Sequence, residues 1–109
     1  MARTTVVLLA LAAVALILSA PLAGATDEGP TLYQAKCAAC HGVDGAGKPA
    51  AGIPSLISEN VKKATDADLH DGIANGGANK RAGHAFQAKG LSPDQIHMIV
   101  SYIRELQKK

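Results

Sequence analysis

The clearest hydrophobic pattern of the chain lies near its C-terminus. The stretch Ser92-Pro93-Asp94-Gln95 combines a capping hydroxyl, a proline suited to the first helical position and a glutamine suited to the third. The apolar residues that follow recur at spacings of three or four, which places them on one face of an α-helix. They are Ile96, Ile99, Val100, Ile103 and Leu106. The sequence therefore predicts a C-terminal helix with one buried face.

Two further helices are expected earlier in the chain. The first runs from Asp27 to Cys40, with Asp27 as its cap and Pro30 in its first turn. The second runs from Thr65 to Asn75, where Thr65 and Asp68 have the spacing of a capping box. A pair of glycines follows Asn75 and is typical of a helix end.

The segments between these helices predict loops. Loops are predicted over Gly42–Pro54 and Asn79–Gly90, because glycine recurs in them and their apolar residues show no regular period. Between them, a short helical turn is expected over Leu56–Val61. No segment alternates apolar and polar residues as a strand would. The predicted fold class is all-α, with three main helices and long loops wrapped around a central group.

The N-terminal segment reads as a leader for export. Arg3 supplies a positive charge, Val6–Leu18 is uncharged and apolar, and Ala23-Gly24-Ala25 is a small-residue cleavage site. We therefore expect a signal peptide over residues 1–25, and a soluble, periplasmic or otherwise exported domain over residues 26–109. An uncleaved membrane anchor stays open, although the apolar run is shorter than the roughly 20 residues of a comfortable span.

The charge of the chain is nearly balanced. Its formal net charge is +2, and loss of Arg3 with the leader would bring the charge closer to zero. This balance does not suggest a nucleic-acid partner.

The expected domain has few aromatic residues, namely Tyr33, Phe86 and Tyr102. A domain this small with so little core material often needs a covalent link, a metal or a cofactor for stability.

The two cysteines of the chain indicate which cofactor. Cys37-Ala38-Ala39-Cys40-His41 is a C-x-x-C-H motif, the attachment signature of c-type haem, in which two thiols reach two vinyl groups and the histidine binds the iron. A simple disulfide is one alternative. A thioredoxin-like site would need a βαβ context, and a zinc site would need further ligands from His70, His84 or His97.

Beyond this motif, the mature chain resembles class I cytochromes c over residues 28–107. The resemblance rests on several short motifs in a fixed order, in which x is any residue: Gly29 and Tyr33, Gly42-x-x-Gly45-x-Gly47, Pro54-x-Leu56, Ile73-x-Asn75-Gly76, Ser92-Pro93-x-Gln95-Ile96 and Tyr102-Ile103-x-x-Leu106. It implies a small cytochrome c-like fold around one covalent haem c per chain.

The resemblance also implies roles for individual residues. Cys37 and Cys40 would form the thioethers, and His41 would be the proximal iron ligand. The Pro54 carbonyl would accept a hydrogen bond from His41. The remaining expected haem contacts are Leu56, Ile73 and Phe86, while Tyr102 would pack the last helix against the first near Gly29 and Tyr33.

The sixth iron ligand departs from the family pattern. The family usually has a methionine shortly before the last helix, but this loop reads Arg81-Ala82-Gly83-His84-Ala85-Phe86. His84 is the expected ligand, because it lies in the same loop and imidazole binds iron well. Met98 falls opposite the apolar face of its helix, and His70 and His97 are expected at the surface. An open site, a water ligand, Lys80 or Lys89 remain alternatives.

These observations predict an electron carrier that is a monomer and not an enzyme. Its partners would be redox proteins, a donor and an acceptor that dock transiently through small interfaces. Lys80 and Arg81 are candidates for pairing with haem propionates or with an acidic partner. The alternatives are a haem protein that binds small diatomic ligands, if the sixth position is open, and a haem subunit of a larger oxidoreductase.

Overall fold

The computed structural model describes residues 28–81 and 83–109, which form five α-helices and one turn of 3-10 helix. The expected signal peptide therefore lies outside the described residues. The elements are α1 (Glu28–Lys36), α2 (Ala38–His41), η1 (Pro49–Ala51), α3 (Glu59–Lys63), α4 (Asp66–Asn75) and α5 (Pro93–Leu106). Within the described ranges the only β-type pairing is an isolated bridge between Lys48 and Ile53, so the all-α prediction is confirmed.

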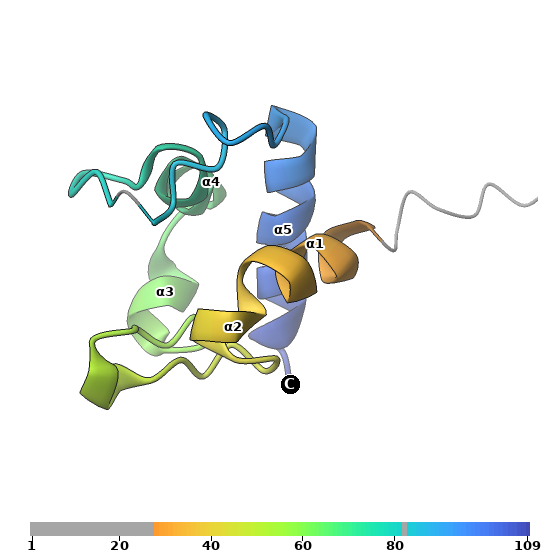
Figure 1. Ribbon diagram of the computed structural model, residues 1–109. Coiled ribbons are helices and arrows are strands. Elements are labelled where there is room, and N and C mark those ends of the chain that lie inside the picture. The colour runs from red at the N-terminus through yellow and green to blue at the C-terminus, as the bar shows by residue number, and fades with distance from the viewer. Residues whose placement is uncertain (1–27, 82) are drawn as a thin grey trace, which may run out of the picture.

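Helix α5 is the centre of the fold, and its predicted start is confirmed. Ser92 caps it, and Ser92 and Gln95 exchange both bonds of a capping box. The apolar face predicted from the sequence is buried, and Ile96 and Ile99 are 0% exposed. Helices α1 and α4 both pack on α5 and supply most of the remaining core (Figure 1). Burial of this stripe drives the docking of the three helices.

Helices α1 and α5 cross closely because Gly29 lacks a side chain. A Cβ atom built at Gly29 would lie 2.6 Å from the backbone oxygen of Met98. Next to this crossing, the rings of Tyr33 and Tyr102 meet edge to face, with their centroids 5.2 Å apart. Such edge-to-face pairs stabilise a core beyond the area they bury. The expected packing of Tyr102 near Gly29 and Tyr33 is thus present.

The first helix differs from the expectation of one continuous helix over Asp27–Cys40. It is interrupted at Cys37, whose φ of −120° departs from helical geometry, and α2 then continues to His41. The Cys37 amide still donates to the Tyr33 carbonyl at 2.8 Å, so the interruption is a bend and not a loop. Asp27, the expected cap, lies outside the described residues.

The short helix before α4 also begins later than expected. We predicted a turn over Leu56–Val61, whereas α3 spans Glu59–Lys63. The Ser58 hydroxyl accepts a hydrogen bond from the Val61 amide and sets this start, since an N-cap satisfies an amide that has no partner within the helix. The Leu56 amide instead donates to the Gly45 carbonyl at 2.7 Å, which holds Leu56 in the loop.

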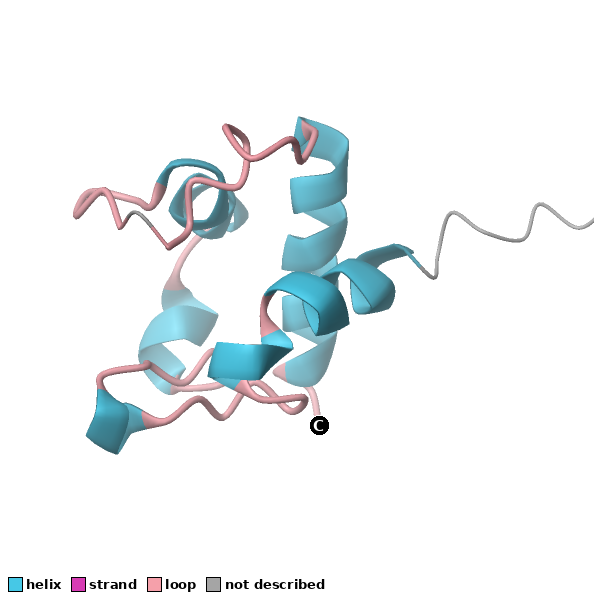
Figure 2. Cartoon of the chain, in the orientation of Figure 1, coloured by secondary structure: helices cyan, strands magenta, loops and turns pink. Residues whose placement is uncertain are grey.

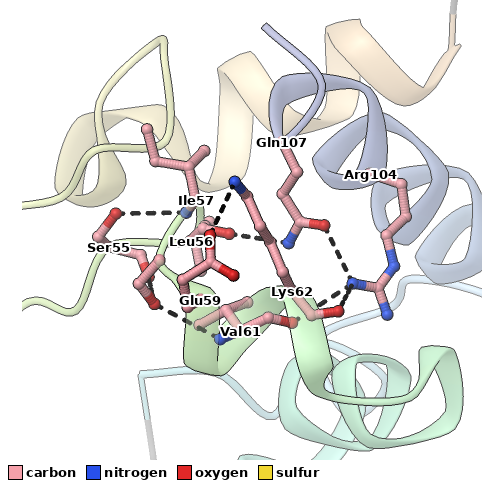
Figure 3. Close-up of polar contacts among 9 residues, drawn as sticks. Ser55, Leu56, Ile57, Glu59, Val61, Lys62, Arg104 and Gln107 are labelled. Atoms are coloured by element: carbon pink, nitrogen blue, oxygen red, sulfur yellow. Dashed lines mark hydrogen bonds and ion pairs between the residues drawn. The ribbon is translucent and has the colours of Figure 1, made fainter.

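Arg104 on α5 fastens the C-terminal end of α3. Its guanidinium donates to the carbonyls of Val61, Lys62 and Ala64, and it pairs with Asp66 at 2.8 Å. Figure 3 shows the Arg104 guanidinium beside Gln107. The Gln107 side chain accepts from Arg104 and donates to the Leu56 carbonyl at 2.9 Å. The carbonyls of Lys62 and Ala64 lie at the end of α3, where the helix supplies no further amide, whereas the Val61 carbonyl also accepts from the Ala64 amide. Arg104 therefore joins α3 and the start of α4 to α5.

Two long loops complete the domain, one before α3 and one between α4 and α5 (Figure 2, pink). Helix α4 carries the predicted Thr65–Asp68 capping box and ends at Gly76, which adopts a left-handed φ of 85°. A Cβ atom at Gly76 would collide with the backbone of Arg81, because the second loop folds back over this point. Glycine at this position therefore allows both the helix end and the return of the loop.

Candidate functional site

Residues of both long loops and of helices α2, α4 and α5 line an open cavity of about 250 Å³. The residues expected from the sequence to bind the cofactor all line it: Cys37, Cys40, His41, Pro54, Leu56, Ile73, His84 and Phe86. Sequence reasoning missed further lining residues, namely Lys36, Gly52, Ile53, Gly83 and Ile103, and had considered Arg81 only for propionates or a partner. An open cavity with a mainly apolar lining and a few polar groups is typical of a ligand site.

The two cysteines lie at one edge of the cavity, around the bend between α1 and α2. Cys37 is 9% exposed, whereas Cys40 is exposed, and neither is in a disulfide. Burial raises the pKa of the Cys37 thiol to about 11, and the nearby Cys40 adds to this shift. Before any covalent link to a cofactor forms, Cys37 is thus a neutral thiol in apolar surroundings.

His41 points its ring into the cavity from the end of α2. Its Nδ1 atom lies 3.2 Å from the Pro54 carbonyl oxygen, which only accepts hydrogen bonds, so Nδ1 carries the proton and donates it. Burial lowers the pKa of His41, an effect partly opposed by the bond to Pro54 and supported by His84 and Arg81. The imidazole is therefore neutral near pH 7, and its Nε2 lone pair is available to a metal.

His84 has the same arrangement on the opposite wall. Its Nδ1 atom lies 3.0 Å from the carbonyl oxygen of Gly72 in α4, so Nδ1 donates and the ring's lone pair lies on Nε2. The ring of Phe86 stacks against His84 with centroids 6.3 Å apart and planes inclined by 28°. A backbone acceptor and a stacked ring thus fix the orientation of this imidazole.

The loop that carries His84 is attached to α4 by backbone hydrogen bonds. The Phe86 amide donates to the Ile73 carbonyl at 3.0 Å, and the Gln87 amide donates to the Ala74 carbonyl at 3.2 Å. On the other side of His84, the Arg81 amide donates to the Gly76 carbonyl at 3.2 Å. The loop therefore returns to the end of α4 on both sides of His84.

The separation of the two imidazoles fits one metal ion between them. The ring centroids of His41 and His84 are 6.1 Å apart, with planes inclined by 37°. Histidine–metal bonds are about 2 Å long, so two ligands on opposite sides of a metal place their nitrogens about 4 Å apart. The remaining distance, about 2 Å, matches the two ring radii together.

The other candidate iron ligands lie elsewhere. Met98, Lys80 and Lys89 are not among the residues that line the cavity. His97 is exposed, as expected. His70 differs from the expectation of a free surface histidine, because it is half-buried and its Nε2 lies 3.2 Å from the Pro93 carbonyl oxygen. His70 thus links α4 to the start of α5, a contact that depends on tertiary packing and leaves no local sequence pattern.

Comparison with known proteins gives the family. The sequence matches the family described as Cytochrome c over residues 26–107. It is 36% identical over 72 residues to the Cbb3-type cytochrome c oxidase subunit CcoP of Rubrivivax gelatinosus, a match that covers 66% of this chain and 23% of that protein. The chain thus spans about a quarter of the length of that relative. No solved structure matches.

This chain belongs to the cytochrome c family, as its resemblance to class I cytochromes c implied. It is a c-type haem protein of electron transfer, and its cofactor is covalently bound haem c. Within the described residues, no helix is both long and apolar enough to traverse a bilayer.

The residues of the cavity fit this cofactor. The two thiols of Cys37 and Cys40 can supply the two covalent links of haem c. The imidazoles of His41 and His84, with ring centroids 6.1 Å apart, also line the cavity. The walls between them are apolar, with Leu56, Ile73 and Ile103 among the lining side chains. Apolar walls keep water from the iron and so contribute to its reduction potential.

Proposed function

We propose that the chain is an exported carrier of single electrons between redox proteins, with one haem c held by thioethers to Cys37 and Cys40. His41 and His84 would hold the iron from its two sides. Export rests on the sequence of residues 1–25, which has the order of a signal peptide. The donor and the acceptor dock transiently near Cys40, which is exposed and lines the cavity.

The pair of facing histidines is the observation that carries this proposal. Each ring donates its Nδ1 hydrogen to a backbone carbonyl, Pro54 for His41 and Gly72 for His84. Both Nε2 atoms are therefore kept as ligands, and neither side chain has to find a new partner when the cofactor is in place. Occupation of both axial positions by the protein favours electron transfer, because it leaves no position for an external ligand.

The bound group supplies one-electron redox chemistry, and the chain controls the conditions of that chemistry. Leu56, Ile73 and Phe86 exclude water from the cavity. Donation of each Nδ1 hydrogen to a backbone carbonyl makes Nε2 a better electron donor to a bound metal, and this favours the oxidised metal. The reduction potential is thus lower than that of a relative with a methionine ligand, since methionine ligation raises the potential.

A second candidate is a haem subunit of a larger oxidoreductase. The similarity to an oxidase subunit favours it, although this chain covers only 23% of that protein. The two candidates differ in assembly. A carrier elutes from a sizing column as a free monomer after mild extraction, whereas a subunit co-elutes with larger partners that have oxidase activity.

The axial assignment is tested with His84→Ala, using His97→Ala as the matched control because His97 is exposed and lies outside the cavity. We expect wild type and His97→Ala to give the same low-spin ferric absorption spectrum. His84→Ala should give a high-spin spectrum, which added imidazole returns to low spin. An unchanged low-spin spectrum in His84→Ala would remove His84 as a ligand.

A further inference from the structure

We propose that Lys89 is a positioning residue that locks the His84 loop and so sets how fast an external ligand can displace His84. This inference rests on the proposed role of His84 as the sixth ligand. Lys89 lies outside the cavity, just before the segment that leads into α5. Its effect on the site is therefore transmitted through the residues that it touches.

Lys89 contacts the residue directly before His84 and the aromatic ring that stacks on His84. Its Nζ atom donates a hydrogen bond of 3.2 Å to the carbonyl of Gly83, the residue directly before His84. The same ammonium lies 5.1 Å from the ring centroid of Phe86, and this ring stacks on His84. One side chain thus holds the backbone before His84 and the aromatic ring beside it.

The segment needs such a contact because its backbone is strained. Ala85, directly after His84, has a φ of 38°, in the left-handed region that residues with a side chain seldom adopt. Strained conformations persist only where surrounding contacts determine them. The links to α4, through the Gly72 and Ile73 carbonyls, act on His84 and Phe86. Lys89 adds a side-chain link to Gly83 from outside that helix.

No ion pair competes for the Lys89 ammonium in the described part of the chain, where the two ion pairs involve Lys62 and Arg104. The positive charge is therefore free to act on the Gly83 carbonyl and on the Phe86 ring together. A cation over an aromatic ring at an exposed site, joined to one hydrogen bond, accounts for about a five-fold effect on an equilibrium. Lys89 thus modulates release of His84 and does not determine whether His84 binds.

The test measures the rate at which saturating cyanide replaces the sixth ligand in the ferric holoprotein. At saturation this rate reports the release of His84. Lys89→Met keeps the length of the side chain but removes its donor and its charge. Lys89→Arg keeps both, and Lys108→Met removes an exposed lysine at the distant C-terminus. We expect about a five-fold faster rate in Lys89→Met only.

A second readout separates positioning from general stability. The denaturant midpoint of Lys89→Met should lie close to that of Lys108→Met, while hydrogen exchange at the Phe86 amide becomes faster, because the lock is local. A rate in Lys89→Met equal to wild type would overturn the proposal, as would failure of Lys89→Arg to restore it. These outcomes leave the axial role of His84 intact, since that role is judged by the spectrum of His84→Ala.

Discussion

Replacing Arg104 with methionine should destabilise the domain without changing its cofactor site. Arg104 is a polar side chain of α5 that contacts the last turn of α3 (Figure 3) and also pairs with Asp66 at the start of α4. Methionine keeps the aliphatic part of the side chain and its packing, but it donates no hydrogen bond. The carbonyls of Lys62 and Ala64 then lose the donor that Arg104 supplies, while the Val61 carbonyl keeps its bond from the Ala64 amide.

The size of the effect follows from the exposure of each contact. The Arg104 side chain is 24% exposed and that of Asp66 is 64% exposed, so their ion pair contributes about 0.5 kcal/mol at most. The carbonyl bonds are charge-assisted and better shielded, but water can replace them in part, and together they contribute about 1.5 kcal/mol. The expected total loss is about 2 kcal/mol, or a fall of about 10 °C in Tm for a domain of this size.

Denaturant unfolding of the holoprotein measures this loss, and two further variants divide it. Asp66→Asn removes only the ion pair and should cost about 0.5 kcal/mol or less. Arg104→Lys keeps the charge but cannot reach several carbonyls at once, so its loss should be intermediate. If Asp66→Asn costs as much as Arg104→Met, the ion pair and not the capping of α3 is the stabilising contact, and the reasoning is refuted.

Three further predictions concern the helix contacts. Gly29→Ala should lower the unfolding free energy by about 2 kcal/mol, because the new Cβ meets a Met98 backbone atom. The control Gly72→Ala has no atom near its new Cβ and should stabilise α4 by about 0.5 kcal/mol. Equal effects of the two variants on the unfolding free energy would contradict the close crossing of α1 and α5. Burial raises the pKa of Tyr33 to about 12 from 10.0, so the folded state gains stability below pH 10 that is lost as the pH rises through 12. Tyr33→Phe should flatten the unfolding free energy across this window, and a profile parallel to wild type would show that Tyr33 does not titrate there. Ser92→Ala should lose about 1 kcal/mol through the α5 cap, while Ser101→Ala, exposed within the same helix, should change little; a similar loss in both variants would discount the cap.

The helices that were predicted well carry their signals locally. In α4 and α5 the cap, the N3 partner and the apolar period lie within a few residues of one another, and both capping boxes form. The start of α3 was predicted three residues early, because the expected turn included the apolar residues Leu56 and Ile57. Leu56 is held outside the helix by the Gly45 carbonyl, a contact between distant parts of the chain.

The candidate site was predictable where a motif names the chemistry. The spacing of Cys37, Cys40 and His41 fixes two thiols and an imidazole on one short helical segment, and the structure places all three at the cavity. The position of His84 in the second loop indicated a ligand, but its support could not be read from the sequence. The Gly72 carbonyl becomes its acceptor only when the loop folds back on α4.

Contacts between helices were the least predictable feature. Arg104 is separated by about 40 residues from the carbonyls it caps, and nothing in its neighbourhood of the sequence marks it. His70 was expected at the surface, yet it lies against the Pro93 carbonyl. Both are polar groups whose partners are backbone atoms, and backbone acceptors leave no residue-type pattern to find.

The absorption spectrum of the purified, exported ferrous protein, recorded directly after addition of carbon monoxide, tests the central claim most directly. We expect the spectrum of a c-type haem, unchanged by carbon monoxide on this timescale, because the proposal assigns both protein ligands of the iron to His41 and His84. Absence of a c-type spectrum would contradict covalent haem at Cys37 and Cys40. A c-type spectrum that shifts at once would show an open sixth position and contradict His84 as its ligand.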